Sequence, residues 1–323
     1  MSHILLTGAG FSRNWGGWLA DEVFEYLIAD IDTTPSIRAQ LWSDRRSGGN
    51  YETTIQALKD RAKKGDDADF KIMNSILGGM FNAMKNAFGR QGFTFNHTTD
   101  TTYQITRFLL RFDWIFTLNQ DTLLEKHYFN NSFSLSSQGK WHGYDVPGLE
   151  HQATSQGSPL DTSSIIVAKQ AGFALQQGGY QPYIKLHGSH NWLASRTSGL
   201  LLITGGNKET DISDSPLLAW YNQLFRQTIC TPHARVMIIG YGFADEHINK
   251  IILEASAKGA KFFIIDPAGV NAFDKRSGAS PGPATYQLYD VLALSVIGAS
   301  RRPLSSTFSS DSVEFGKVNG FFV

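Results

Sequence analysis

Short apolar runs alternate along the chain with longer segments in which apolar residues recur at helical spacing. The runs, which end at turn-forming residues, are His3–Thr7, Phe112–Leu118, Tyr183–Leu186, Leu200–Thr204, Val236–Gly240 and Lys261–Asp266. The segments with helical spacing are Trp18–Ala29, Phe70–Phe88, Thr102–Leu110, Leu217–Thr228 and Glu246–Ala257. Several runs are apolar at consecutive positions, which is typical of strands covered on both faces. The pattern therefore predicts an α/β fold, a Rossmann-like parallel sheet with helices on both faces.

The spacing of these elements also predicts the domain organisation. One domain is expected over residues 1–300, with a helical insertion at about residues 31–111, because this mostly helical interval is too long for a simple crossover. Residues 130–181 are rich in Ser, Gly and Gln and are expected to form a long loop region that could act as a lid. Residues 301–323 form a C-terminal tail, which docks either on the body or on a neighbouring subunit.

Composition narrows the class of protein. The 323 residues can bury a sizeable core, and 29 basic residues balance 29 acidic ones, so no global field attracts nucleic acid or an anionic membrane. The single cysteine, Cys230, excludes a disulfide within the chain and a cysteine-based zinc site. No signal peptide and no apolar run near ~18 residues is apparent, so we expect a cytoplasmic protein without a membrane segment.

The opening stretch "HILLTGAGFSRNWGGW" leads from an apolar run directly into glycines. Gly8 and Gly10 would allow the backbone to approach a pyrophosphate, whose charge would meet the amides at the start of the helix that follows. The dehydrogenase fingerprint is incomplete, because its third glycine would fall at Arg13. The motif indicates either a nucleotide held in another way or a tight turn with no ligand.

Three further motifs place polar residues at the carboxyl ends of predicted strands, where open α/β sheets bind ligands. Asn119 and Asp121 lie in "WIFTLNQDTLLE", and His187 lies in "YIKLHGSHNW". The stretch "VMIIGYGFADEHIN" breaks at Gly240 and Gly242 before a predicted helix. The sequence therefore predicts that these groups meet at one edge of the sheet.

The four motifs, in this order, resemble those of the sirtuin family and in particular its bacterial antiphage-defence branch. "GAGFS" is similar to the sirtuin GAG-x-S loop, "TLNQD" to TQN-[IV]-D, and "KLHG" to the histidine–glycine motif, while "IIGYGFADEH" resembles the loop that holds adenosine. The resemblance covers roughly residues 1–270. Two features depart from the family. The paired C-x-x-C motifs of its zinc module are missing, and "NWGGWLAD" replaces the G-I-P-D-F-R segment.

The resemblance implies catalytic roles for three residues. Asn119 would hydrogen-bond the nicotinamide ribose and order a water near C1′, and Asp121 would accept a hydrogen bond from the carboxamide. His187 would act as general base toward the ribose hydroxyls or the attacking water, because its unperturbed pKa lies near working pH.

The resemblance also implies two sets of residues that bind the substrate. The pyrophosphate set is Gly8, Ala9, Gly10, Ser12 and Arg13. The set at the adenosine end is Gly240, Tyr241, Gly242 and Asp266.

Several of these polar residues also have simpler structural interpretations. Asp121 would cap the following helix, which is compatible with a role in binding. His190 and Asn191 would shape the loop after the strand. His247, one turn into a helix, is expected to face solvent. The histidines show no metal-ligand spacing, so we expect no metal site.

The function that the resemblance implies is an NAD+ glycohydrolase that releases nicotinamide and ADP-ribose, and that depletes NAD+ in antiphage defence (abortive infection) when activated. A homo-oligomer is expected, or an activating partner such as a helicase-like ATPase or an Argonaute-type protein, without direct nucleic-acid binding. Two alternatives stay open: an NAD-dependent protein deacylase or ADP-ribosyltransferase, and a sensor that binds NAD or ADP-ribose without cleaving it.

Overall fold

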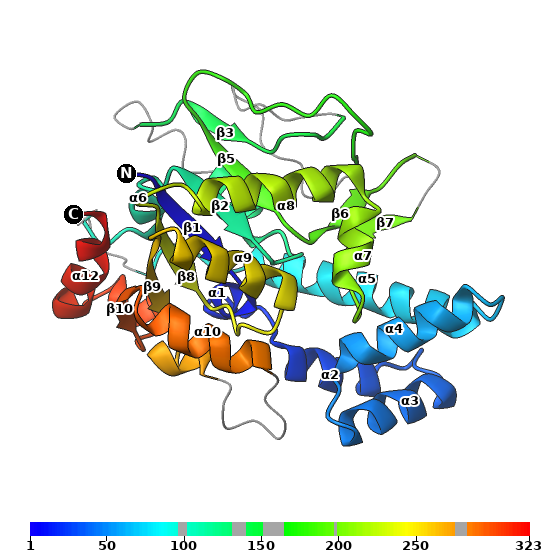
Figure 1. Cartoon of the computed structure of the whole chain (residues 1–323). Helices are drawn as coiled ribbons and strands as arrows, with labels where there is room; N and C mark the ends of the chain where they lie inside the picture. The colour runs from blue at the N-terminus through cyan, green and yellow to red at the C-terminus, as the bar shows by residue number, and fades with distance from the viewer. Residues whose placement is uncertain (96–101, 131–139, 151–164, 197–198, 275–282) are drawn as a thin grey trace.

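The computed structural model describes residues 1–95, 102–130, 140–150, 165–196, 199–274 and 283–323. Its centre is a seven-stranded sheet in which every neighbouring pair of strands is parallel (Figure 1). The strand order is β10-β9-β8-β1-β2-β5-β3. The strands are β1 (His3–Thr7), β2 (Trp114–Thr117), β3 (Gly143–Asp145), β5 (Tyr180–Lys185), β8 (Arg235–Ile239), β9 (Lys261–Ile265) and β10 (Val296–Ser300).

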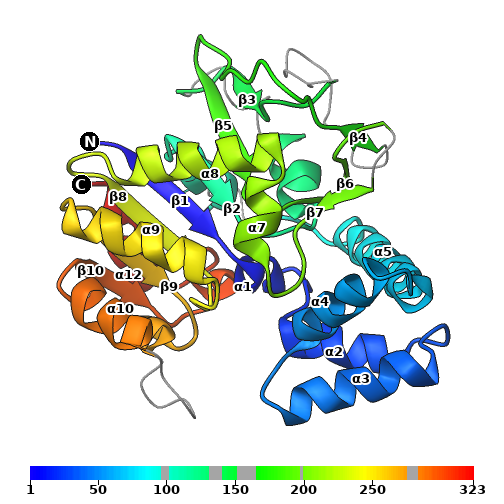
Figure 2. The same ribbon diagram turned by 45° about the vertical axis from the view of Figure 1, so that its right-hand side comes forward.

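The sheet is covered on both faces, as predicted. Helices α8 (Pro216–Ile229), α9 (Glu246–Ala257) and α10 (Pro283–Ala293) lie in a row along one face (Figures 1 and 2). On β9, Phe263 contacts the ring of Phe321, whereas the neighbouring side chains point to the opposite face because strand side chains alternate. Both sets are buried, so the centre of the sheet is apolar on both sides.

The C-terminal tail docks on the body. It contains α11 (Leu304–Thr307), α12 (Ser312–Asn319) and the 3-10 turn η4 (Gly320–Phe322). The rings of Phe321 and Phe322 pack on His3 and Phe112, and Phe321 is 1% exposed. Of the two sequence-based alternatives, this chain shows the tail packed on its own sheet.

A second, small sheet has the order β4-β6-β7, from β4 (Ile166–Val167), β6 (Gly188–Leu193) and β7 (Leu200–Leu202). It corrects the expectation that residues 200–204 belong to the parallel sheet, because β7 pairs antiparallel with β6. It also corrects the picture of residues 130–181 as loop alone, since β3, β4 and the start of β5 lie in that interval. Two parts of that interval, residues 131–139 and 151–164, fall outside the described residues.

Four helices pack together beside the sheet: α2 (Ala20–Ala29), α3 (Pro35–Arg46), α4 (Tyr51–Ala62) and α5 (Ala68–Phe88) (Figures 1 and 2). Local sequence fixes their starts. Thr34 accepts a hydrogen bond from the Ile37 amide and precedes a proline, and Asn50 caps α4 in the same way. Residues 31–111 contain three of these helices and α6 (Ile105–Leu109), and α2 joins them although it precedes that interval.

The remaining helical elements of the described chain are short: α1 (Ala9–Arg13), the π-helical turn η1 (Glu125–Phe129), α7 (Lys208–Ser213) and the 3-10 turn η3 (Gly269–Phe273). Of the helices in the described part of the chain, not one combines the length and the apolar character that crossing a bilayer requires.

Candidate functional site

A cavity of about 930 Å³ lies at the carboxyl edge of the sheet. Residues directly after β1, β2, β5, β8, β9 and β10 line it, so six strands deliver side chains or backbone to one space. The chain runs from β1 outward on one side and later returns to β8 on the other, which makes this edge a topological switch point. Its volume is at the upper end of ordinary ligand pockets.

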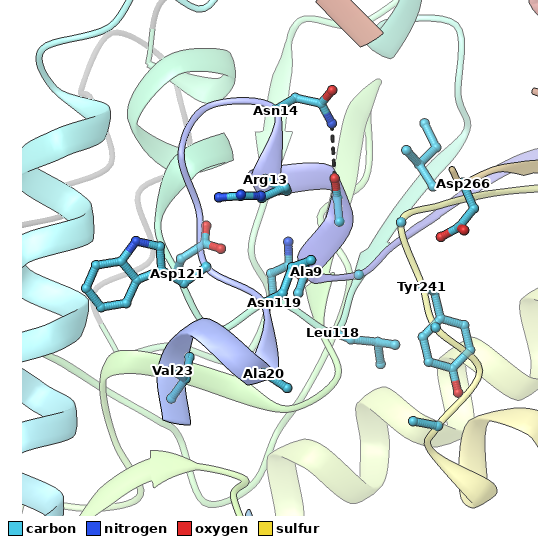
Figure 3. A pocket seen from close by; sticks show the side chains of 18 of the residues that line it. Ala9, Arg13, Asn14, Ala20, Val23, Leu118, Asn119, Asp121, Tyr241 and Asp266 are labelled. Atoms are coloured by element: carbon cyan, nitrogen blue, oxygen red, sulfur yellow. Dashed lines mark hydrogen bonds between the residues drawn. The ribbon is translucent and has the colours of Figure 1, made fainter. Parts of the chain in front are cut away.

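Eleven of the twelve sequence-predicted site residues line this cavity: Gly8, Ala9, Gly10, Arg13, Asn119, Asp121, His187, Gly240, Tyr241, Gly242 and Asp266. Figure 3 shows Asn119 and Asp121 toward one side of the cavity and Tyr241 and Asp266 toward the other. Ser12 is the exception, because it is buried beneath the cavity. The structure therefore brings the four motifs together around a single space.

The two glycine loops touch each other backbone to backbone. The Gly10 amide donates to the Gly240 carbonyl at 2.9 Å, and the Gly8 amide donates to the Ile239 carbonyl at 3.0 Å. A Cβ atom at Gly10 would lie 2.7 Å from the Gly240 Cα, so only glycine allows this approach. These two amides are thus occupied within the protein and are not free to donate to a phosphate.

The turn after β1 also differs from the one expected. It enters the one-turn helix α1, and the amphipathic helix α2 begins only at Ala20. Among the described residues 8–11, the Ala9 amide is the one for which no backbone acceptor is found. Arg13 lies at the other end of α1, and its guanidinium pairs with Glu22 at 2.8 Å, with the Arg13 side chain 49% exposed. Ala9 and Arg13 are therefore the groups of this loop best placed to meet an anion.

Asn119 is held in place from below by Ser12. Its Nδ2 donates to Ser12 Oγ at 2.9 Å, and its backbone amide donates to Thr117 Oγ1 at 3.0 Å. Thr117 in turn accepts from Thr7 Oγ1 at 2.8 Å, which links the ends of β1 and β2. One Nδ2 proton of Asn119 is used in this chain, so Oδ1 and the second proton remain to bind a group in the cavity.

Asp121 both caps a helical turn and lines the cavity. Its Oδ1 accepts from the Leu123 amide at 3.0 Å, which is the structural role anticipated from the sequence. Its carbonyl accepts from Lys185 Nζ at 2.5 Å, and the same ammonium bonds Glu125 Oε1 at 2.6 Å. Lys185 is fully buried, so this ion pair anchors the loop after β2 to strand β5.

His187 follows β5 and is 3% exposed. Burial lowers its pKa to about 3, and Asp245 opposes this shift while Lys208 and His247 add to it. The imidazole is therefore neutral at neutral pH, which is the state a proton acceptor needs. Its Nε2 lies 3.1 Å from Nε2 of His247.

The position of His247 corrects an expectation. The sequence predicts that this residue faces solvent, but it is 7% exposed and contacts His187. The donor atoms of His187, Asp245 and His247 all lie within 4.8 Å of one another, close enough to hold a metal ion. Spacing along the chain could not reveal this group, because His187 follows a strand and the other two residues begin α9.

A series of ion pairs connects Asp245 of this group to helices α7 and α4. Lys208 Nζ bonds Asp245 Oδ1 at 2.6 Å and Glu52 Oε1 at 2.9 Å. Burial alone would lower the pKa of Lys208, but Glu52 and Asp245 together raise it. Lys208 stays charged, and it joins α7, α9 and α4 at the rim of the cavity. The sequence analysis gave none of these three residues a binding role, because none lies directly at the end of a predicted strand.

The wall beside Asp121 is apolar, and the opposite wall is cationic. Trp18 and Val23 line the cavity together with three residues of α5, namely Met80, Phe81 and Met84. Arg301 and Arg302, directly after β10, line it together with Asp266. Helical periodicity predicts that the α5 residues are buried. It does not predict that they line this cavity. The arginines fall in the stretch that the sequence analysis assigned to the tail.

The hydroxyl of Tyr241 is not free for a ligand. It accepts from the Asp245 amide at 3.1 Å and lies 2.9 Å from Asn249 Oδ1. The tyrosine therefore stiffens its own loop, and the ring and the neighbouring backbone form the wall of the cavity.

Comparison with known protein families identifies a family for the chain. The SIR2-like domain model matches residues 113–279, which is more than half of the 323 residues. The matched part includes Asn119, His187 and the loop after β8, whereas the glycine loop after β1 precedes it. No curated protein matches the sequence.

Proposed function

The chain belongs to the SIR2-like domain family, whose members use NAD+, and on that premise we propose that it is an NAD+ glycohydrolase. The observation that supports this function is the convergence of the Gly8–Gly10 loop, the Asn119 amide and the neutral His187 imidazole on one cavity. The products would be nicotinamide and ADP-ribose, with water as the acceptor.

Cleavage of the nicotinamide–ribose bond passes through a transition state with oxocarbenium character, as in glycoside hydrolysis. Nicotinamide leaves as a neutral molecule, so the protein needs no strong acid at the leaving group. Asn119 holds the ribose or the attacking water through its free Oδ1 and N–H. His187 accepts the proton of that water, a contribution typically worth ~10²–10⁴-fold in rate.

The two walls of the cavity match the two ends of the substrate. The apolar surface of Trp18, Val23, Met80, Phe81 and Met84 would take the flat nicotinamide ring, with Asp121 accepting from its carboxamide. The pyrophosphate would lie by the Ala9 amide and Arg13. The adenosine end of NAD+ would contact the Gly240–Gly242 backbone and Asp266, with Arg301 and Arg302 nearby.

We further propose that this activity depletes NAD+ during bacterial antiphage defence and that assembly controls it. The expected states are a homo-oligomer, or a complex with an activating protein such as a helicase-like ATPase or an Argonaute-type protein. The neutral net charge supports triggering through a protein contact over direct capture of nucleic acid.

The test is nicotinamide release from NAD+ by the purified chain, measured by chromatography over a range of protein concentrations while light scattering reports the mass. Asn119→Ala and His187→Ala are each expected to reduce release at least ~100-fold. Lys71→Ala, on an exposed face of α5, is the control and should match wild type. Unimpaired release by both site variants would contradict the assignment.

A further inference from the structure

His187 is one half of a buried pair of imidazoles. Its partner His247 lies in the first turn of α9, 60 positions further along the chain. The two rings have centroids 5.2 Å apart, and their Nε2 atoms are separated by 3.1 Å, a hydrogen-bond distance. His187 lines the cavity, whereas His247 is not among the lining residues. His247 therefore contacts His187 without lining the cavity.

This geometry restricts where protons can be. Two facing nitrogen atoms at this distance need one N–H between them, so one ring donates and the other accepts. Nε2 of His187 is engaged by His247, which leaves Nδ1 as the ring atom available to a group in the cavity. A His187 ring that donates through Nε2 has its lone pair on Nδ1, as a proton acceptor requires.

Burial lowers the pKa of His247 as well as that of His187, and the carboxylate of Asp245 opposes both shifts. Glu52 and Asp245 contribute two carboxylates and Lys208 contributes one ammonium, so their formal charges sum to one negative when both rings are neutral. The other charged groups near His247 are Glu209 and Lys250, which pair with each other at 2.8 Å. A single proton on the pair would neutralise the buried group.

A metal ion is the competing occupant of this position. Three ligand atoms are available, but the ammonium of Lys208 lies 2.6 Å from Asp245 Oδ1. A divalent cation at the same carboxylate would be repelled by this charge, whereas a single proton shared by two imidazoles adds half as much charge. The surroundings therefore disfavour a divalent cation more strongly than a single proton.

We infer that His247 is a positioning residue for His187 that also receives the proton which His187 takes from the attacking water. This inference rests on the proposed hydrolysis of NAD+. As the water oxygen bonds to the ribose carbon, its proton moves to Nδ1 of His187, and the Nε2 proton of His187 passes to Nε2 of His247. Nicotinamide leaves with the electron pair of the broken bond, and the proton is then released to solvent.

Because His187 is a weak base, transfer of its proton to His247 would help it to accept the proton of the water. A ring with a pKa of about 3 holds a proton poorly at neutral pH. Passing the proton to a second ring near Asp245 removes the charge from the more buried position beside the developing oxocarbenium ion. The relay thus lets a deeply buried imidazole act as a base.

Two substitutions separate the relay from simple packing. In His247→Gln the amide oxygen can still accept the hydrogen bond but cannot take the proton, and His247→Phe removes both properties. We expect both variants of the full chain to lower kcat at least about tenfold with KM for NAD+ changed less than threefold. His127→Gln, which removes a partly buried imidazole that bonds the Phe88 carbonyl outside the cavity, is the matched control and should keep the wild-type kcat. Wild-type kcat in His247→Gln would overturn the relay.

A second measurement is independent of activity. In ¹⁵N-labelled full-length protein at pH 7, NMR should show two neutral rings with scalar coupling between the Nε2 atoms of His187 and His247. If wild type shows this coupling but releases no nicotinamide, the proposed function fails and the pair stands. Absence of the coupling would overturn the hydrogen-bonded pair. Stoichiometric binding of ZnCl₂ that changes the ¹⁵N chemical shifts of both rings would also overturn it, because the group would then be a metal site.

Discussion

His190 is the residue whose burial has the clearest cost. Its ring stacks on Phe81 with centroids 5.2 Å apart, and its Nε2 is buried without a hydrogen-bond partner in the described structure. Burial, with smaller contributions from Lys185 and Lys85, lowers its pKa to about 4. Its backbone amide bonds the Gln120 carbonyl, and His190 lies within strand β6, which corrects the expectation that it shapes a loop.

The depressed pKa predicts how stability changes with pH. The unfolded chain takes up a proton on His190 near pH 6.5, but the folded chain does so only near pH 4. Stability is therefore fully present above pH 6.5 and is lost as the pH falls toward 4. His190→Phe should reduce the loss of unfolding free energy between pH 7 and 4.5 by about 1–3 kcal/mol. Urea unfolding at both pH values measures this, and an unchanged loss would contradict it.

The control for this prediction is His142→Gln, at an exposed position. The loss of stability between the two pH values should be the same as in wild type. His187, with a pKa lowered to about 3, shifts stability in the same direction and remains in both variants. The difference between the variants therefore isolates His190.

At the scale of elements, the contact between the loops after β1 and β8 depends on glycine. Gly240 has φ of +63°, and a Cβ there would lie 2.3 Å from the Gly10 carbonyl carbon and from the Phe11 nitrogen. A side chain would strain the backbone and also push the two loops apart. The close approach of these two cavity-lining loops thus depends on two residues that carry no side chain, Gly10 and Gly240.

Gly240→Ala is expected to lower the free energy of unfolding by at least about 2 kcal/mol and to weaken NAD+ binding. Gly242→Ala is the matched control for stability, because a Cβ at Gly242 would meet no atom within 4 Å. It should stay within ~0.5 kcal/mol of wild type. Thermal unfolding and calorimetric NAD+ titration measure the two effects. Equal stability of the two variants would show that the loops can separate without cost.

At the scale of the whole molecule, the group of helices α2–α5 contacts the rest of the chain in part through ion pairs between α4 and α7. Lys59 Nζ bonds Asp211 Oδ1 at 2.6 Å, in addition to the bond from Lys208 to Glu52. These pairs are partly buried and close to the cavity rim. These two charged contacts join α4 to segments far away in the sequence and so help to hold it beside the cavity.

Breaking one of these contacts should loosen α4 without disturbing the sheet. In Asp211→Asn we expect amides of residues 51–62 to exchange about fivefold faster, which corresponds to about 1 kcal/mol, while amides of β1 and β8 are unchanged. Hydrogen exchange with mass spectrometry measures this. Lys71→Ala, which removes an exposed pair within α5, should leave α4 unchanged. Uniform acceleration across the chain would contradict a local role.

The sequence by itself determined several of the elements and the edge of the sheet at which the polar residues gather. Strand β1 and helix α9 have the predicted bounds, because period and turn residues are local properties. Asn119, His187 and Gly240 were found because each follows a strand, and parallel strands end at a common edge. The order of the strands did not follow from these patterns, nor did the side sheet that contains β7.

Tertiary structure alone decided the partners of these residues. His247 is buried against His187, and Ser12 accepts a hydrogen bond from Asn119. The amides of Gly8 and Gly10 donate to carbonyl groups at the end of β8. Each of these contacts joins segments far apart along the chain, where periodicity carries no information. A residue's type and spacing predict which chemistry it can perform, whereas its protonation and its free donors depend on the neighbours that folding brings to it.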